Sequence, residues 1–241
     1  GTPILPIYST FLQRAYDQII NDLCINNSNA LILVYRASIY GNKDMTHLGF
    51  NDISMLGNMP NLMYLAPTTV EELESSIHYG LEHHNHPIAI RIPVGTPIND
   101  TAQSDTIDKP VTSYDITQSG NTIAIIGVGN FYHKAVELSH AIRETTHMSP
   151  TIVKPLCISS LDTDTLNELT KDHHIVITLE DGELEGGYGQ KIASYYGKTS
   201  MKVLNYGISK QFYDRYKPED VLQQNHLDFE HILDDIRNVQ H

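Results

Sequence analysis

The feature that most constrains the fold of this chain is a series of short apolar runs that alternate with segments of helical periodicity. The clearest run is "ALILVY", residues 30–35. An apolar run of this length is typical of a strand buried on both faces of a parallel sheet. Residues 11–25 precede it, with apolar side chains spaced near the helical repeat. Strands and helices that alternate in this way predict a parallel sheet with helices on both faces.

The same alternation runs through most of the chain and is interrupted once. Before the interruption, strands are predicted at 3–8, 30–35, 62–67 and 88–93, and helices at 11–25 and 69–83. After it, strands are predicted at 122–128, 151–156, 175–180 and 201–206, and helices at 131–146, 163–171, 188–196 and from about 228. The fold class is therefore α/β, with two domains that each have an open sheet.

Local signals mark the boundaries of these elements. Thr10 with Gln13, and Thr69 with Glu72, have the spacing of a capping box and predict helix starts. Residues 38–51 are rich in Gly, Asn and Asp and predict a loop that is too polar for a core element.

The interruption lies at 96–113, where Pro, Asp, Thr and Ser replace the periodic pattern. We interpret this segment as a linker. The predicted domains are then 1–95, truncated at its N-terminus, and 114–241. We expect a fragment or one part of a split gene, because Gly1 is only a few residues before an apolar strand that we expect to be buried.

Composition excludes several classes of partner. The net charge of −13 argues against non-specific nucleic-acid binding, which needs a basic face, but a few arginines can still hold a small anion. No apolar run reaches the ~18 residues of a membrane span. Cys24 and Cys157 lie far apart in the sequence and suit a reducing compartment, so we expect a cytoplasmic protein. From the net charge and the lack of a long apolar run, we expect no nucleic-acid or membrane partners. His83, His84 and His86 have no Cys or carboxylate set beside them, so no metal site is predicted there.

Ligands bind open α/β sheets at the carboxyl ends of the strands. This rule selects four segments: Tyr8–Arg14, Arg36 with the loop to His47, Arg91–Gly95 and Glu180–Gly189. The first segment places aromatic rings and a guanidinium at the start of a helix. On pattern alone, it is an equally good interpretation that Phe11 is a core residue and that Arg14 is a solvated surface charge.

These segments carry a resemblance to the 1-deoxy-D-xylulose-5-phosphate synthases, a family of transketolase-like, thiamine diphosphate-dependent enzymes. The resemblance covers nearly the whole chain. Its motifs are "IYSTFLQRAYDQ", "RASIYGNKDMTHLGFNDISML", "APTTVEELESSIHYG" and "IRIPVG" for the pyrimidine-binding domain, and "VITLEDGELEGGYGQKIA" and "VLNYGI" for the C-terminal domain.

The resemblance implies a role for five residues of this chain. Phe11 would stack on the aminopyrimidine ring of thiamine, with Tyr8 beside it. Arg14 and Arg36 would face the substrates. His47 would be catalytic, since an imidazole gives or takes a proton near neutral pH.

Some positions depart from the family pattern. Val94 stands where a substrate-phosphate arginine is expected, Lys43 where an acidic residue is expected, and Tyr35 where an aspartate is expected. These departures leave the acceptor substrate open. In the family, Arg91 is structural or pocket-lining, and the loop at Glu180–Gly189 packs near the other domain.

The resemblance further implies that the chain holds only part of a pocket. The family's pyrimidine-binding glutamate would precede Gly1, and the "GDG" motif that binds Mg²⁺ and the diphosphate belongs to an N-terminal domain. We therefore expect the chain to be inactive alone, and to form a homodimer or associate with an N-terminal half. The complete enzyme would decarboxylate pyruvate and transfer a two-carbon unit to glyceraldehyde 3-phosphate.

Two alternatives remain at this point. The chain can be the β-type subunit of a split transketolase or 2-oxoacid dehydrogenase, whose subunits share this domain order. It can also be a non-catalytic dimerisation fragment.

Overall fold

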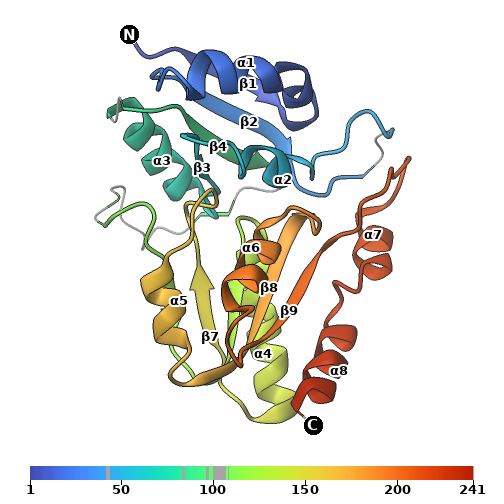
Figure 1. The fold of residues 1–241 in the computed structure, drawn as a ribbon. Helices are drawn as coiled ribbons and strands as arrows, with labels where there is room; N and C mark the ends of the chain where they lie inside the picture. Colours follow the sequence, from blue (N-terminus) through green and yellow to red (C-terminus); the bar gives the residue numbers. More distant parts are fainter. Residues whose placement is uncertain (42–43, 83–84, 96–97, 100–106, 108, 241) are drawn as a thin grey trace.

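The computed structural model describes every residue except 42–43, 83–84, 96–97, 100–106, 108 and 241. Figure 1 shows two α/β units stacked on each other, with the N-terminal unit above the C-terminal one. The first sheet has the strand order β1-β2-β4-β3, and all its pairings are parallel. The second has the order β5-β7-β6-β8-β9 and is parallel except for β5, which runs antiparallel to β7. The prediction of two open α/β sheets is confirmed.

The strands are β1 (Ile4–Tyr8), β2 (Leu31–Ala37), β3 (Met63–Leu65), β4 (Ile88–Pro93), β5 (Asp115–Gln118), β6 (Thr122–Gly127), β7 (Thr151–Lys154), β8 (His173–Glu183) and β9 (Lys202–Ile208). The α-helices are α1 (Tyr16–Gln18), α2 (Asp52–Leu56), α3 (Val70–Glu82), α4 (Phe131–Thr146), α5 (Thr163–Leu169), α6 (Tyr188–Tyr196), α7 (Pro218–Gln224) and α8 (Phe229–Gln240). A 3₁₀ segment, η1 (Ser9–Ala15), and a π segment, η2 (Ile19–Cys24), flank α1.

Strand β2 shows why its sequence is apolar without alternation. Ile32 and Val34 pack into one core cluster, together with Leu12 of η1. Leu31 packs into another cluster on the opposite face, where Leu33 also lies. Successive side chains of a strand point to opposite faces, so both sets must be apolar when both faces are covered.

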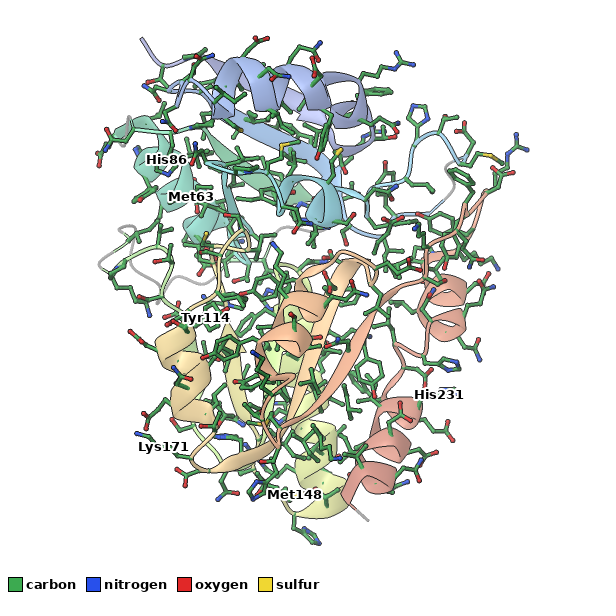
Figure 2. The ribbon with its side chains drawn as sticks, in the orientation of Figure 1. Met63, His86, Tyr114, Met148, Lys171 and His231 are labelled. Carbon is green, nitrogen blue, oxygen red and sulfur yellow. The ribbon has the colours of Figure 1, made fainter. Side chains whose placement is uncertain are left out.

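The second sheet is also covered on both faces. In β6, Ala124 and Ile126 belong to the same cluster as Ile32 and Val34 of the first unit. The opposite face of β6 packs in a cluster that includes residues of α4 and α8. The core therefore continues from one unit into the other. In Figure 2, Met63 and His86 lie in the upper unit, Tyr114 lies near the junction, and His231 lies on α8.

Strand β1 differs from the prediction of a buried strand. Ile4 is 48% exposed and Leu5 is 45% exposed. The reason is topological: β1 is at the edge of its sheet and pairs only with β2 among the described strands. An apolar edge strand of this kind presents a surface on which another polypeptide can pack.

The predicted helix 11–25 forms as a composite of η1, α1 and η2 over residues 9–24. Its predicted capping box is wrong: the Thr10 hydroxyl instead donates to the backbone oxygen of Thr46, at 2.7 Å. The capping signal at α3 is confirmed, since Thr69 Oγ1 accepts from the backbone N–H of Glu72 at 3.2 Å.

Three elements were not predicted: α2, β5 and α7. The region 38–51 also differs from the prediction of a loop outside the core, because Leu48 and Phe50 are buried in the core of the C-terminal unit. The Phe50 ring meets the Tyr213 ring edge-on, with centroids 5.6 Å apart. Isolated apolar residues within a polar segment carry no periodic signal, so only the folded chain reveals their burial.

A buried cation joins the two units. The Arg91 guanidinium on β4 donates from Nε to Asp52 at 2.7 Å and from Nη1 to Asp181 at 2.6 Å. The Tyr64 hydroxyl also donates to Asp52. The Arg91 side chain is 1% exposed and both carboxylates are fully buried. Burial opposes the charge on Arg91, but Asp181 and Asp52 together raise its pKa above the ordinary value. The structural interpretation of Arg91 is therefore confirmed.

A second buried acid, Glu180, caps helix α6. Its carboxylate accepts the backbone N–H groups of Tyr188 at 2.9 Å and Gly189 at 2.8 Å. Burial raises the pKa of Glu180 from 4.5 to about 7, although these two hydrogen bonds act in the opposite direction. Ser54 of α2 donates to Glu183, and Asn58 donates to the Gly186 oxygen. The predicted packing of this loop near the other domain is confirmed.

Replacing Arg91 with methionine should lower the free energy of unfolding by about 3–5 kcal/mol, because Asp52 and Asp181 would stay buried without their cation. Urea unfolding followed by circular dichroism measures the loss. Arg143→Met, at an exposed position on α4, is the matched control and should cost less than ~0.5 kcal/mol. Equal losses in the two variants would contradict a structural role for the buried cation.

The raised pKa of Glu180 predicts a specific pH dependence of stability. The folded protein holds this proton more tightly than the unfolded chain, so the stability from this group is complete below pH 4.5 and is lost as the pH rises through about 7. The loss is ~3 kcal/mol, since one pKa unit corresponds to ~1.4 kcal/mol. Relative to Glu180→Gln, the wild-type chain should therefore become less stable over this range. The exposed control Glu168→Gln should show no such change with pH. If the stability difference between the wild type and Glu180→Gln does not depend on pH, the raised pKa of Glu180 is wrong.

Candidate functional site

The candidate site lies where β1 and β2 end. Tyr8 is the last residue of β1, and Phe11 follows it in η1. Arg36 is at the end of β2. His47 lies on the segment that leads to α2, which we call the His47 loop (residues 44–51). Parallel strands bring their carboxyl ends to one edge of a sheet, so residues far apart in the sequence meet here.

The rings of this site contact one another. The Tyr8 and Phe11 rings are stacked at 20°, with centroids 6.0 Å apart. The His47 ring meets Phe11 edge-on, with centroids 5.5 Å apart. Phe11 is 36% exposed and Tyr8 is 40% exposed. Phe11 is therefore not a core residue, and the interpretation of it as one is wrong.

Two guanidinium groups lie against these rings. Arg36 is 4.6 Å from the Tyr8 centroid, and Arg14 is 5.9 Å from the Phe11 centroid. Arg36 has a φ of 54°, in the left-handed region that favours glycine. The register of β2 on β4 shifts at the same place, between Tyr35 and Ala37. Irregularities of this kind in a strand are common next to binding sites, and strained backbone often accompanies a binding function.

The His47 imidazole is oriented by its own loop. Thr46 Oγ1 lies 2.8 Å from His47 Nδ1, and the same hydroxyl donates to Asp44 Oδ1. Because this hydroxyl proton is already used, its oxygen accepts from Nδ1–H. The proton of the neutral ring is thus on Nδ1, and Nε2 carries the lone pair that a substrate can meet.

Asp44 completes this arrangement. The Thr46 hydroxyl, the Thr46 backbone N–H at 2.9 Å and His47 together lower the pKa of Asp44 from 3.8 to about 2. The carboxylate therefore stays ionised at any physiological pH and favours the Nδ1–H form of His47. The predictions from sequence did not include Asp44 and Thr46 as site residues; the spacing D-x-T-H was the available signal.

The His47 loop is also tied to the rest of the unit. Tyr40 donates its hydroxyl proton to the His47 backbone oxygen at 2.7 Å. Thr10 does the same to the Thr46 backbone oxygen at 2.7 Å. Both contacts involve backbone oxygens of the loop, so they hold the loop in place and leave Nε2 of the imidazole unused.

The structure brings together all five residues that the sequence analysis selected: Tyr8, Phe11, Arg14, Arg36 and His47. Val94 lies just beyond β4 and is 39% exposed. Lys43, His83 and His84 lie outside the described residues. The roles of the five residues stay predictions.

The site residues suit a flat aromatic ligand that carries negative charge. Exposed ring faces offer stacking, two guanidinium groups offer charge, and an imidazole offers proton transfer. Within the described ranges, no group of three or more His, Cys, Asp or Glu side chains could hold a metal ion. None of the helices in these ranges is long and apolar enough to cross a membrane.

Comparison with known families gives two matches that follow each other along the chain. The model for the transketolase pyrimidine-binding domain matches residues 2–96, and the model for the transketolase C-terminal domain matches residues 113–232. The predicted boundaries at residues 95 and 114 stay a prediction.

Curated relatives include 1-deoxy-D-xylulose-5-phosphate synthases. That of Clostridium tetani is 34% identical over 248 residues, which cover 98% of this chain and 38% of the relative. That of Gloeothece citriformis is 32% identical, with 97% of this chain and 37% of the relative covered. The chain thus spans about 38% of the length of the first of these relatives.

A solved structure shows the same fold. It is described as a split-gene transketolase in an inactive β4 tetramer, and it matches with a TM-score of 0.85 over 99% of this chain and 76% of that chain. The sequence identity is 18%, so this likeness concerns the fold alone.

Removing the Thr46 hydroxyl should raise the pKa of Asp44 from about 2 toward 3.8, since this hydroxyl is the largest cause of the lowered value. The variant is Thr46→Val, and carbon NMR of the Asp44 carboxyl group against pH measures the change. Thr10→Val is the control, because it removes a contact to the same loop without touching Asp44. An unchanged Asp44 pKa in Thr46→Val would contradict the arrangement described here.

Proposed function

Because the chain belongs to the transketolase family, we propose that it is the C-terminal part of a thiamine diphosphate-dependent 1-deoxy-D-xylulose-5-phosphate synthase. Membership of this family implies thiamine diphosphate as the cofactor. The proposed reaction joins pyruvate, after decarboxylation, to glyceraldehyde 3-phosphate. The relatives named above support this choice within the family.

The observation that carries the proposal is the meeting of Phe11 and His47 on one exposed surface, with ring centroids 5.5 Å apart. An aromatic ring 36% exposed at a strand end offers a face on which the aminopyrimidine ring can stack. The imidazole beside it supplies a proton donor or acceptor at the same place. These two residues therefore fit the cofactor and its reaction.

In the proposed mechanism, bound thiamine diphosphate supplies a carbon centre that stabilises negative charge on the acyl group. Phe11 holds the pyrimidine ring, and Tyr8 extends the aromatic surface. His47 exchanges a proton with a substrate oxygen through Nε2, while Asp44 and Thr46 keep Nδ1 protonated. Arg36 and Arg14 attract the carboxylate and phosphate groups of the substrates.

The rest of the pocket is proposed to come from polypeptide beyond these 241 residues. This applies to the carboxylate that meets the pyrimidine ring and to the groups that bind Mg²⁺ and the diphosphate. The exposed apolar face of β1 is consistent with such a covering. We therefore propose that the chain is inactive alone and works as a homodimer or together with an N-terminal half.

The acceptor substrate is less constrained. The Val94 side chain cannot donate hydrogen bonds to a phosphate, and a bidentate arginine contact is among the stronger anion contacts in proteins. We propose glyceraldehyde 3-phosphate as the acceptor, with Arg14 and Arg36 as the cationic residues of this chain that face its phosphate.

A second proposal is a β-type subunit of a split transketolase or 2-oxoacid dehydrogenase. The observation that favours it is the fold neighbour described as a split-gene transketolase, 76% of which this chain covers. A non-catalytic association module is the third. All three share the fold and differ in what the chain does with a complementary half.

Reconstitution distinguishes these proposals. The chain is mixed with the part of the Clostridium tetani relative that it does not match, and thiamine diphosphate with Mg²⁺ is titrated in by calorimetry. We expect heat of binding in the mixture and none with the chain alone. Phe11→Ala should weaken binding about tenfold, because the stacking contact is lost.

In the same mixture, His47→Ala should lower the turnover of pyruvate and glyceraldehyde 3-phosphate by about 10²–10⁴ while cofactor binding is retained. His78→Ala, at an exposed position on α3, is the control and should leave both unchanged. Full turnover in His47→Ala would refute the catalytic role. Binding without turnover of these substrates would favour the split transketolase, and no binding in the mixture would favour the non-catalytic module.

A further inference from the structure

A cavity of about 280 Å³ lies between the two units, next to the candidate site. Its lining comes from η1, from the segment 45–55 and, in the C-terminal unit, from Glu183 and Phe212. Phe11 and His47 are not among its lining residues. The cavity is therefore lined by a different set of residues from the exposed rings, although Thr10 and Met45 of its lining are close to Phe11 and His47 in the sequence.

A buried hydroxyl marks the inner wall of this cavity. Ser9 is 3% exposed, and its Oγ has no hydrogen-bond partner in the part of the chain that the structure describes. Most buried hydroxyls have a partner, because leaving one unpaired costs free energy. Ser9 lines the cavity, so a polar atom inside the cavity can supply the missing hydrogen bond.

A carboxylate that makes no salt bridge with any of the described residues, Glu183, faces the same space. Glu183 is partly buried and accepts a hydrogen bond from Ser54 Oγ at 3.2 Å. Burial raises its pKa above the ordinary value. The neighbouring cation, Lys210, pairs with Glu185 at 3.3 Å. Among the described lining residues there is no Lys, Arg or His, so the carboxylate sets the charge of the cavity.

The remaining lining residues include both polar and apolar side chains. Gln13 and Asn51 carry amide oxygens that can accept hydrogen bonds, and Leu48 and Met55 provide apolar surface. Phe212 belongs to the lining and is 81% exposed, so its ring lies at the solvent end. Such a lining suits a ligand with a carbon skeleton and a polar, proton-donating end.

We propose that this cavity binds a small organic cation that carries a primary ammonium group. The ammonium group donates to Glu183 and to Ser9 Oγ, and the carbon skeleton packs against Leu48 and Met55. Phe212 can cover the entrance and attract the charge through its ring face. An anion is disfavoured by the carboxylate, and a neutral polar ligand leaves that charge uncompensated.

This inference goes beyond the proposed function, which makes no use of the cavity. The test uses the 241-residue chain without thiamine diphosphate, so its outcome is independent of the cofactor experiment. The probe is 1,4-diaminobutane, and the matched ligand is 1,4-butanediol, which has a similar shape without charge. Saturation-transfer NMR and calorimetry measure binding.

We expect the diamine to bind at least about tenfold more tightly than the diol, since a charge-assisted hydrogen bond is stronger than a neutral one. Glu183→Gln should reduce diamine affinity about tenfold or more. Glu168→Gln removes the same charge from an exposed residue outside the lining and should change the affinity less than about twofold, because exposed charges interact weakly with their surroundings.

Ser9→Ala provides a second check on the inner wall and should weaken diamine binding. Circular dichroism confirms that each variant is folded. Equal binding of diamine and diol would overturn the proposal, as would equal effects of Glu183→Gln and Glu168→Gln. Absence of diamine binding to the folded wild-type chain would also overturn it.

Discussion

The arrangement of the two units depends on the burial of one guanidinium between two carboxylates. Arg91 comes from the first sheet, Asp52 from the start of α2 and Asp181 from the second sheet. A single unpaired charge buried in this position would cost too much desolvation free energy. Each of the three charged groups can be buried only because the others are present. The ion pairs therefore hold β4, α2 and β8 together, and the shared apolar core extends around them.

The same interaction contributes to the geometry of the candidate site. Asp52 follows directly after the His47 loop, so fixing Asp52 fixes one end of that loop. Phe50 anchors the loop in the core of the C-terminal unit, and Tyr40 and Thr10 bind its backbone. The imidazole is thus placed beside Phe11 by contacts from both units, although all five proposed site residues belong to the first. The cavity next to the site is another consequence of this joining, since Glu183 and Ser9 come from different units and line the same cavity.

Much of the fold could be predicted because parallel strands buried on both faces leave an unambiguous pattern. The run around Ile32 and Val34 required a central strand, and the structure confirms it. The exposure of Ile4 could not be predicted, because an edge strand and a central strand have the same apolar sequence. Helix α2 is too short for a periodic signal, and Asp44 and Thr46 sit in a loop where no periodicity exists.

The sequence by itself determined the α/β class, the order of most elements and the set of aromatic and basic residues at the strand ends. It did so because hydrophobic periodicity and strand-end position are local properties of the chain. Only the tertiary structure decided which nitrogen of His47 faces outward, that Arg91 is an internal cation and that Ser9 and Glu183 share a cavity. The Arg91 ion pairs join residues 39 and 90 positions apart, and Ser9 and Glu183 line one cavity although they lie far apart in the sequence. The His47 contacts depend on the conformation of a loop without periodicity, so no local pattern encodes any of these arrangements.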